Sequence, residues 1–104
     1  MTVYVDRQQN RFRGMVMCHM LADTEAELHA MADRIGARRD WYQRDASTPH
    51  YDVPLFRRAM AIEFGAVEIG RRETVAIIRR IRTNPASFFE SSGDVSYRLL
   101  GAGA

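Results

Sequence analysis

The residues of this chain best suited to chemistry are its three histidines, because each has an acidic residue nearby. The pairs are His19 with Asp23, His29 with Asp33, and His50 with Asp52. Imidazole and carboxylate groups held close together are what both general acid–base catalysis and metal binding require. The sequence therefore predicts a pocket built from histidine and aspartate, provided that the fold brings such residues together.

His50 and Asp52 are the strongest candidates, since only Tyr51 separates them. Side chains alternate between the two faces of an extended strand, so His50 and Asp52 would share one face. They could then bind a metal together, or Asp52 could orient His50 as a general base. Asp52 also stands just before a predicted helix, so a structural role at the start of that helix stays open.

His19 interrupts an apolar run over residues 15–21, whose length suits a buried strand. It is either a buried histidine satisfied by a hydrogen bond or a ligand or base on a rigid strand. Cys18 would point to the opposite face, where we interpret it as a small buried side chain. His29 either pairs with Asp33 on a helix surface or turns toward the pocket. The predicted catalytic residues are His50, Asp52 and His19, and the predicted metal ligands are Asp6, His19, His50 and Asp52.

All fifteen basic residues are arginines, and the net charge is only +2. Arginine binds phosphate or carboxylate through a planar fork, although a bias in codon usage explains the absence of lysine equally well. The low net charge argues against a strongly electrostatic nucleic-acid binder. Trp41 either stacks on a ring of a ligand or belongs to the core. The predicted ligand-binding residues are Arg38, Arg39, Trp41, Gln43 and Arg58.

The clearest element is a helix over residues 25–35. Thr24 and Glu27 form a capping box, an apolar stripe follows, and Gly36 ends the helix. Two more helices are expected, one from Pro54 to Gly65 with Leu55, Ala59 and Ile62 facing the core, and one from Gly70 to Asn84. Strands are expected over residues 2–5, 15–21, 37–42, 50–53 and 66–69, and loops over 7–14 and 43–49.

This order of elements predicts a small α/β layered fold, with a mixed, mostly parallel sheet of four to five short strands and about three helices. In such a sheet ligands collect at the carboxyl ends of the strands, which include Asp6, Asp23 and Gln43. Residues 1–85 form the predicted domain. The tail, residues 86–104, is too apolar to be wholly solvated, so it docks on the domain or contacts a second copy, and residues 101–104 are expected to be disordered.

A single cysteine, the absence of a signal peptide and the absence of an apolar run of bilayer length predict a cytoplasmic protein without a membrane partner. The chain also lacks a Walker loop, a dinucleotide fingerprint and an HExxH motif.

From about Thr2 to Arg80 the chain resembles a bacterial and bacteriophage family catalogued as domain of unknown function 4031. The matching segments are Val3-Tyr4-Val5-Asp6, Met17-Cys18-His19-Met20, residues 27–36, Trp41 with Gln43, His50-Tyr51-Asp52, Arg58-Ala59 and residues 65–69. The resemblance implies that Asp6, His19, His29, His50 and Asp52 belong to the family pattern. It implies no activity, because the family is uncharacterised, and the segment 44–49 is longer here than is usual for it.

Two functions follow from these observations, and whether the chain is an enzyme stays open. In the first, a His/Asp pocket binds a divalent metal, a phosphate-bearing ligand such as a nucleotide or nucleic acid, or both, and is suited to hydrolysis. In the second, the chain is a non-catalytic interaction module that binds a protein or nucleic acid and acts as a homodimer, with Phe88 and Phe89 at the contact.

Overall fold

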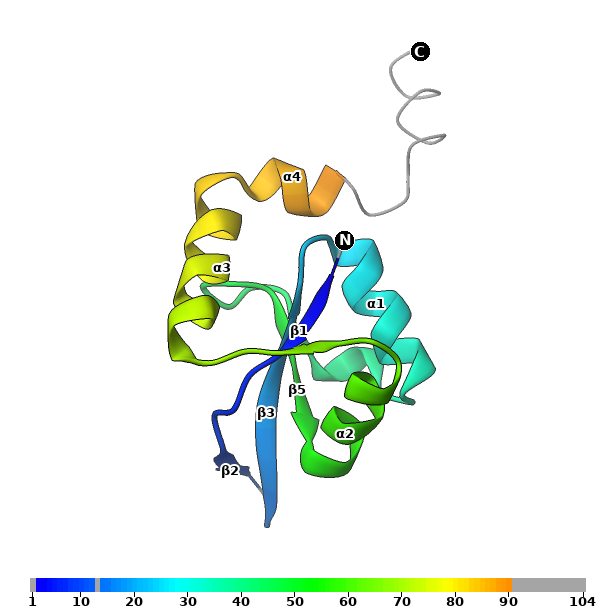
Figure 1. Cartoon of the computed structure of the whole chain (residues 1–104). Helices are drawn as coiled ribbons and strands as arrows, with labels where there is room; N and C mark the ends of the chain where they lie inside the picture. The colour runs from blue at the N-terminus through cyan, green and yellow to red at the C-terminus, as the bar shows by residue number, and fades with distance from the viewer. Residues whose placement is uncertain (1, 13, 91–104) are drawn as a thin grey trace.

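A computed structural model describes residues 2–12 and 14–90 of the chain, and its centre is a six-stranded sheet (Figure 1). The strands lie in the order β4-β5-β3-β1-β6, and β2 pairs with β3. Their bounds are β1 Val3–Val5, β2 Asn10–Phe12, β3 Met15–Ala22, β4 Tyr42–Gln43, β5 His50–Pro54 and β6 Val67–Glu68.

The expectation of a mostly parallel sheet is wrong. β3 runs antiparallel to β1, β2 and β5, and β4 runs antiparallel to β5, so the β1–β6 pair is the one parallel pair among the described strands. The segment 7–14, expected to be a loop, contains β2 and returns the chain onto β3. Such short connections can join only antiparallel neighbours, because a parallel pair needs a long crossover.

Four α-helices and one short 3-10 helix accompany the sheet in the described part of the chain. They are α1 Glu25–Arg34, η1 Arg39–Trp41, α2 Leu55–Glu63, α3 Arg71–Thr83 and α4 Pro85–Glu90. The start of α1 is as predicted, since the Thr24 hydroxyl accepts a hydrogen bond from the Glu27 amide and donates one to the Glu27 carboxylate. The region 37–42, expected to be a strand, instead forms η1 followed by the two residues of β4.

The helices lie on both faces of the sheet (Figure 1). α1 and α2 cover one face, where Met20, Tyr51 and Val53 are completely buried. α3 packs near β1 on the other face and contributes Ile77 and Ile81 to the core. The part of that second face that carries β2 and the first half of β3 has no helix over it, and this gap positions the site described below.

The prediction of which α2 residues face the core is wrong. Leu55, Ala59 and Ile62 are exposed, and Ala61 is the buried residue of the helix. α2 follows β5 without a loop, with Pro54 as its N-cap, so the strand sets the rotation of the helix. The periodicity of apolar residues finds a stripe but does not decide which side of the helix meets the sheet.

The segment after α3 folds back over the end of the domain. α4 contacts both α3 and α1, and Phe88 is almost completely buried in the core. The expected disorder of residues 101–104 lies outside the described residues. In the part of the chain that is described, none of the helices has the length and apolar character needed to span a bilayer.

Candidate functional site

The uncovered part of the sheet carries a hollow of about 750 Å³, here called the sheet-face pocket. It crosses β2, β3, β5 and β4 and reaches η1. The sequence predicted six of the residues that line it, which are His19, Arg38, Trp41, Gln43, His50 and Asp52. The others are Asn10, Arg11, Phe12, Met15, Met17 and Asp40. Most of the predicted chemistry therefore lies in one place, although it comes from three separate segments of the chain, at residue 19, residues 38–43 and residues 50–52.

Strand register brings the two histidines together. His19 of β3 is the direct cross-strand partner of Asp52 of β5, so both side chains lie on the same face of the sheet. His50 precedes Asp52 by two positions and shares that face. Tyr51 points to the opposite face, where it is completely buried beneath the helices.

His19, His50 and Asp52, here called the open triad, direct one donor atom each toward a common point. The Asp52 Oδ1 atom is 3.3 Å from His50 Nε2 and 3.7 Å from His19 Nε2. The imidazole rings meet edge to face, with centroids 4.8 Å apart. All three donor atoms lie within 4.8 Å of one another, which is close enough for the group to hold a metal ion after a small adjustment of the side chains.

A hydrogen bond at the Nδ1 atom of each histidine in the triad fixes the orientation and the tautomer of its ring. The His19 Nδ1 atom is 2.8 Å from Asp6 Oδ2, and the His50 Nδ1 atom is 2.8 Å from the Thr48 carbonyl oxygen. A carbonyl oxygen can only accept, so His50 donates from Nδ1 and its Nε2 carries the lone pair when the ring is neutral. Neutral His19 takes the same tautomer against the carboxylate. Histidine ligands of metals are commonly oriented in this way.

Asp6, predicted as a metal ligand, lies behind His19 and is not a member of the open triad. Its buried carboxylate accepts hydrogen bonds from the backbone amides of His19 and Gln8 and from the His19 ring. The hydrogen bond to Asp6 raises the pKa of His19, against the opposing effect of burial. The geometry therefore makes Asp6 an orienting partner of His19.

Two predicted ligand-binding arginines lie away from the sheet-face pocket. Arg58 donates to the Asp6 backbone carbonyl and to the Glu68 carboxylate, and its hydrogen bond lowers the pKa of Glu68. Arg39 forms an exposed ion pair with Asp33, with 3.8 Å between the charged atoms. Both arginines flank His50 only in sequence, because the strands and helices between them carry the two side chains elsewhere.

The sequence reasoning missed the residues that β2 contributes. Asn10, Arg11 and Phe12 line the sheet-face pocket, and Phe12 is 56% exposed. An aromatic residue inside a polar segment that ends at a glycine is a hairpin signal, and this was the signal available. The prediction of a loop over residues 7–14 therefore missed the β2–β3 hairpin.

The third histidine belongs to a different group on the helix-covered face, here called the covered cluster and made of Glu25, His29, Tyr42 and Tyr51. His29 Nδ1 shares a 2.7 Å hydrogen bond with the Tyr51 hydroxyl, and Tyr42 donates a 2.7 Å hydrogen bond to Glu25. Burial is the main cause that lowers the pKa of His29 and raises that of both tyrosines. His29 thus pairs with Tyr51, and neither of the two alternatives expected for it is what the structure shows.

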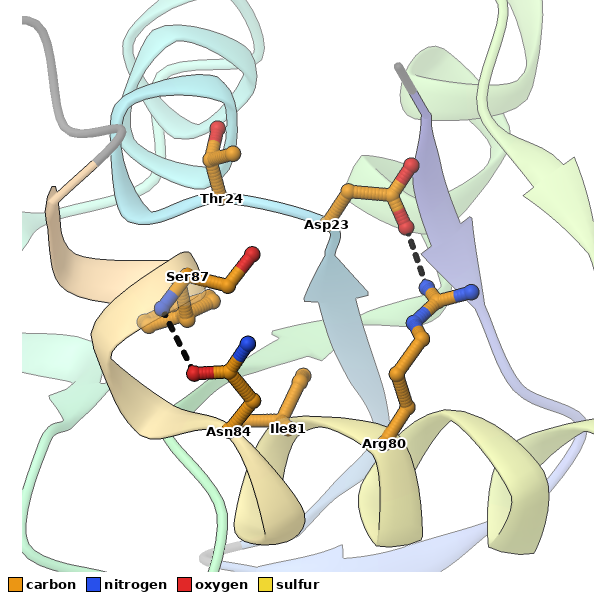
Figure 2. Close-up of a pocket in the computed structure, with 7 residues that line it drawn as sticks. Asp23, Thr24, Arg80, Ile81, Asn84 and Ser87 are labelled. Carbon is orange, nitrogen blue, oxygen red and sulfur yellow. Dashed lines mark hydrogen bonds and ion pairs between the residues drawn. The ribbon is translucent and has the colours of Figure 1, made fainter.

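A second hollow, of about 450 Å³, lies between the start of α1 and the α3–α4 corner (Figure 2). Its polar groups already bind one another. Asp23 accepts hydrogen bonds from Arg80, from the Tyr4 hydroxyl and from the Thr2 amide, and Asn84 accepts one from the Ser87 amide. The Arg80 contact joins α3 to the end of β3, and the bond between Ser87 and Asn84 stabilises the start of α4, so we interpret this hollow as structural.

Comparison with known proteins gives a single result. A sequence profile described as "Protein of unknown function (DUF4031)" matches residues 3–81. No curated protein and no solved structure matches the chain. The matched segment contains every residue of the open triad together with Asp6.

Proposed function

We propose that this chain, which belongs to the DUF4031 family, binds one divalent transition-metal ion at His19, His50 and Asp52 and holds a phosphate-bearing ligand against it. The observation that carries the proposal is the convergence of two imidazole nitrogens and one carboxylate oxygen at the floor of an open pocket. A hydrogen-bonded partner behind each ring already selects the tautomer that a metal needs.

The donor set defines the class of metal. Two imidazoles and one carboxylate suit zinc, manganese or iron, and the lack of thiolate donors argues against sites of the zinc-finger type. Cys18 is 1% exposed and lies on the opposite face of β3, so it cannot join the triad. Three protein ligands leave at least one coordination position for water or substrate, which is the arrangement of catalytic rather than structural sites. Hydrolysis of a phosphate ester is the reaction that this arrangement favours.

The surroundings of the open triad support an anionic ligand. Arg11 and Arg38 line the sheet-face pocket, and Trp41 forms part of its wall. Arg38 is held by Asp40 through two hydrogen bonds of 3.1 Å, but both side chains are largely exposed, so this pair is weak. A phosphate group can therefore replace Asp40 as the partner of Arg38 with little loss of free energy.

Metal stoichiometry tests the proposal. Protein stripped with a chelator and then titrated with zinc or manganese should bind one equivalent. His19→Gln, His50→Gln and Asp52→Asn should each weaken binding at least about 100-fold, because each removes one of three ligands. His29→Gln is the matched control, since it removes a partly buried histidine from outside the triad.

Two outcomes would contradict the metal site. One is the absence of a bound equivalent with zinc, manganese and iron alike. The other is equal loss of metal in His29→Gln and in His50→Gln, which would show that binding depends on general folding and not on the triad.

A dimeric interaction module is the second candidate, and the exposed side of α2 favours it. Leu55, Phe56 and Ile62 are exposed there. Two copies of α2 packed antiparallel would bury these apolar side chains and bring opposite helix dipoles together. Sedimentation equilibrium should then show a dimer that Leu55→Ser with Ile62→Ser dissociates. The use of Phe88 at such a contact is not supported, since it fills the core of its own chain.

A bacterial or bacteriophage source and a cytoplasmic location stay predictions. The family match supports the kinship from which the first was inferred, and the single buried cysteine is consistent with the second. Localisation of a fluorescent fusion in a bacterial host would test the second.

A further inference from the structure

We propose that the sheet-face pocket binds a short single strand of nucleic acid, laid across the sheet with one phosphodiester at the open triad. The inference rests on the proposed metal site and adds the class of substrate. Its starting point is that the pocket has an aromatic and a basic residue at each of its two ends, with the triad between them.

Sheet topology places the two ends on opposite sides of the triad. Met17 of β3 pairs with Asn10 of β2 and also with Pro54 of β5, so β2 and β5 lie along opposite edges of β3. β4 then pairs with the far edge of β5. Adjacent strands lie about 4.8 Å apart, so the path from β2 to β4 spans about 14 Å with His19 and His50 on the two middle strands. A span of this size exceeds what one nucleobase covers.

The aromatic residues provide a stacking surface at each end. Phe12 is the cross-strand partner of Met15, which places it on the same face as His19, and its side chain is 56% exposed. Trp41 stands at the other end, partly buried against the core at the end of η1. Bases of any sequence can stack on such rings, and this is how proteins bind single strands without base pairing. Duplex DNA keeps its bases stacked inside, so it cannot use these surfaces.

The local charge suits a backbone of a few phosphates. Arg38 lies near Trp41, and Arg11 lines the β2 end of the pocket although its register partner is Val16, one position out of phase with Phe12. A divalent ion at the triad would balance the two carboxylates of the pocket, Asp40 and Asp52, and leave the two arginines to bind phosphate. The whole chain carries a net charge of only +2, so long-range attraction is small and binding depends on these few contacts. Two neutralised phosphates would give a slope of about −1.4 in a plot of log affinity against log salt.

Trp41 provides the measurement, because it is the only tryptophan of the chain and lines the pocket. Zinc-loaded protein is titrated with a thymidine tetranucleotide carrying phosphorothioate links to slow cleavage, with thymidine monophosphate, and with a DNA hairpin. Quenching of Trp41 fluorescence reports binding. We expect the tetranucleotide to bind at least tenfold more tightly than the mononucleotide. We expect the base-paired stem of the hairpin to contribute no binding affinity.

Variants at the β2 end show whether a second base is bound there. Phe12→Ala should weaken tetranucleotide binding between about 5-fold and about 150-fold, because one stacked base is lost. The matched control is Phe56→Ala, which removes an equally exposed phenylalanine from α2. Arg11→Gln should make the salt slope shallower by about 0.7, and Arg72→Gln, an exposed arginine of α3, should leave it unchanged.

Three results would overturn the inference. They are equal affinity for the tetranucleotide and the mononucleotide, equal effects of Phe12→Ala and Phe56→Ala, and tighter binding to the duplex. The metal content of the same samples separates this failure from failure of the proposed function. Protein that holds one zinc ion but binds no tetranucleotide contradicts the substrate class alone, whereas protein that holds no zinc contradicts the metal site.

Discussion

The open triad and the covered cluster place the same side chain in two different environments on the two faces of one sheet. The His19 ring is hydrogen-bonded to the Asp6 carboxylate on one side and lines the sheet-face pocket on the other. The His29 ring is hydrogen-bonded to the Tyr51 hydroxyl under the helices. The charged partner raises the pKa of His19, and burial lowers that of His29. His29 also has a carboxylate nearby, since its Nε2 atom is 3.8 Å from Glu25. The comparison therefore shows that a histidine near an acid in sequence becomes a candidate site only where strand register adds further donor groups beside it and the helices leave it uncovered.

Among the changes that distinguish the open triad from the covered cluster, the largest effect is expected on metal affinity when Asp6, the partner behind His19, is altered. Asp6→Asn keeps the shape of the side chain but removes its charge, so the ring is held less firmly and is less basic. We expect metal affinity to fall about 10- to 100-fold, as is usual for such outer partners. Calorimetric titration with zinc measures the change. Glu25→Gln is the counterpart in the covered cluster and should leave the affinity within about twofold, so equal losses would remove the distinction between the two groups.

An intermediate effect is expected on stability when the covered cluster loses its central hydrogen bond. Tyr51→Phe keeps the buried ring and removes the hydroxyl that binds His29. The free energy of unfolding should decrease by about 1 kcal/mol, since a polar partner is left without its hydrogen bond. Urea denaturation measures it. Metal affinity should change little, because Tyr51 points away from the triad, and a large loss of metal would mean that the two faces are coupled.

The smallest expected effect is the opposite pH dependence of the two histidines. In the metal-free protein, NMR titration of the ring protons should give a pKa above about 6.5 for His19 and below about 6.5 for His29, the value of an unperturbed imidazole. As the pH falls from about 6.5 through the lowered pKa of folded His29, the unfolded chain binds that proton more readily. The His29 contribution to stability is therefore lost on the acid side.

His19 acts with the opposite sign. Its raised pKa in the folded state contributes stability that is complete below about 6.5 and is lost as the pH rises through the folded value. Unfolding experiments across about pH 5 to 8 on His29→Gln should remove the acid-side loss and leave the His19 contribution in place. Shifts of the same sign for the two rings would contradict the assignment of their environments.

Local sequence determined much of the secondary structure. The capping box at Thr24 starts α1 because its donors and acceptors lie within one turn. In α3, Ile77 and Ile81 are four residues apart, so they share one face of the helix and both are buried. The sharing of one face by His50 and Asp52 was predictable for the same reason, since alternation along a strand is a property of neighbouring residues.

What only the tertiary structure decided depends on contacts between distant segments. The antiparallel register of β3 and β5 sets His19 opposite Asp52, the pairing of β2 with β3 brings Phe12 to the pocket, and the direct passage from β5 into α2 turns Leu55 outward. Strand pairing is fixed by hydrogen bonds and packing between segments far apart in the chain, and a shift of one residue would move every side chain to the other face. The sequence therefore supplies the residue types of the site, but only the pairing of strands in the folded sheet brings these residues together.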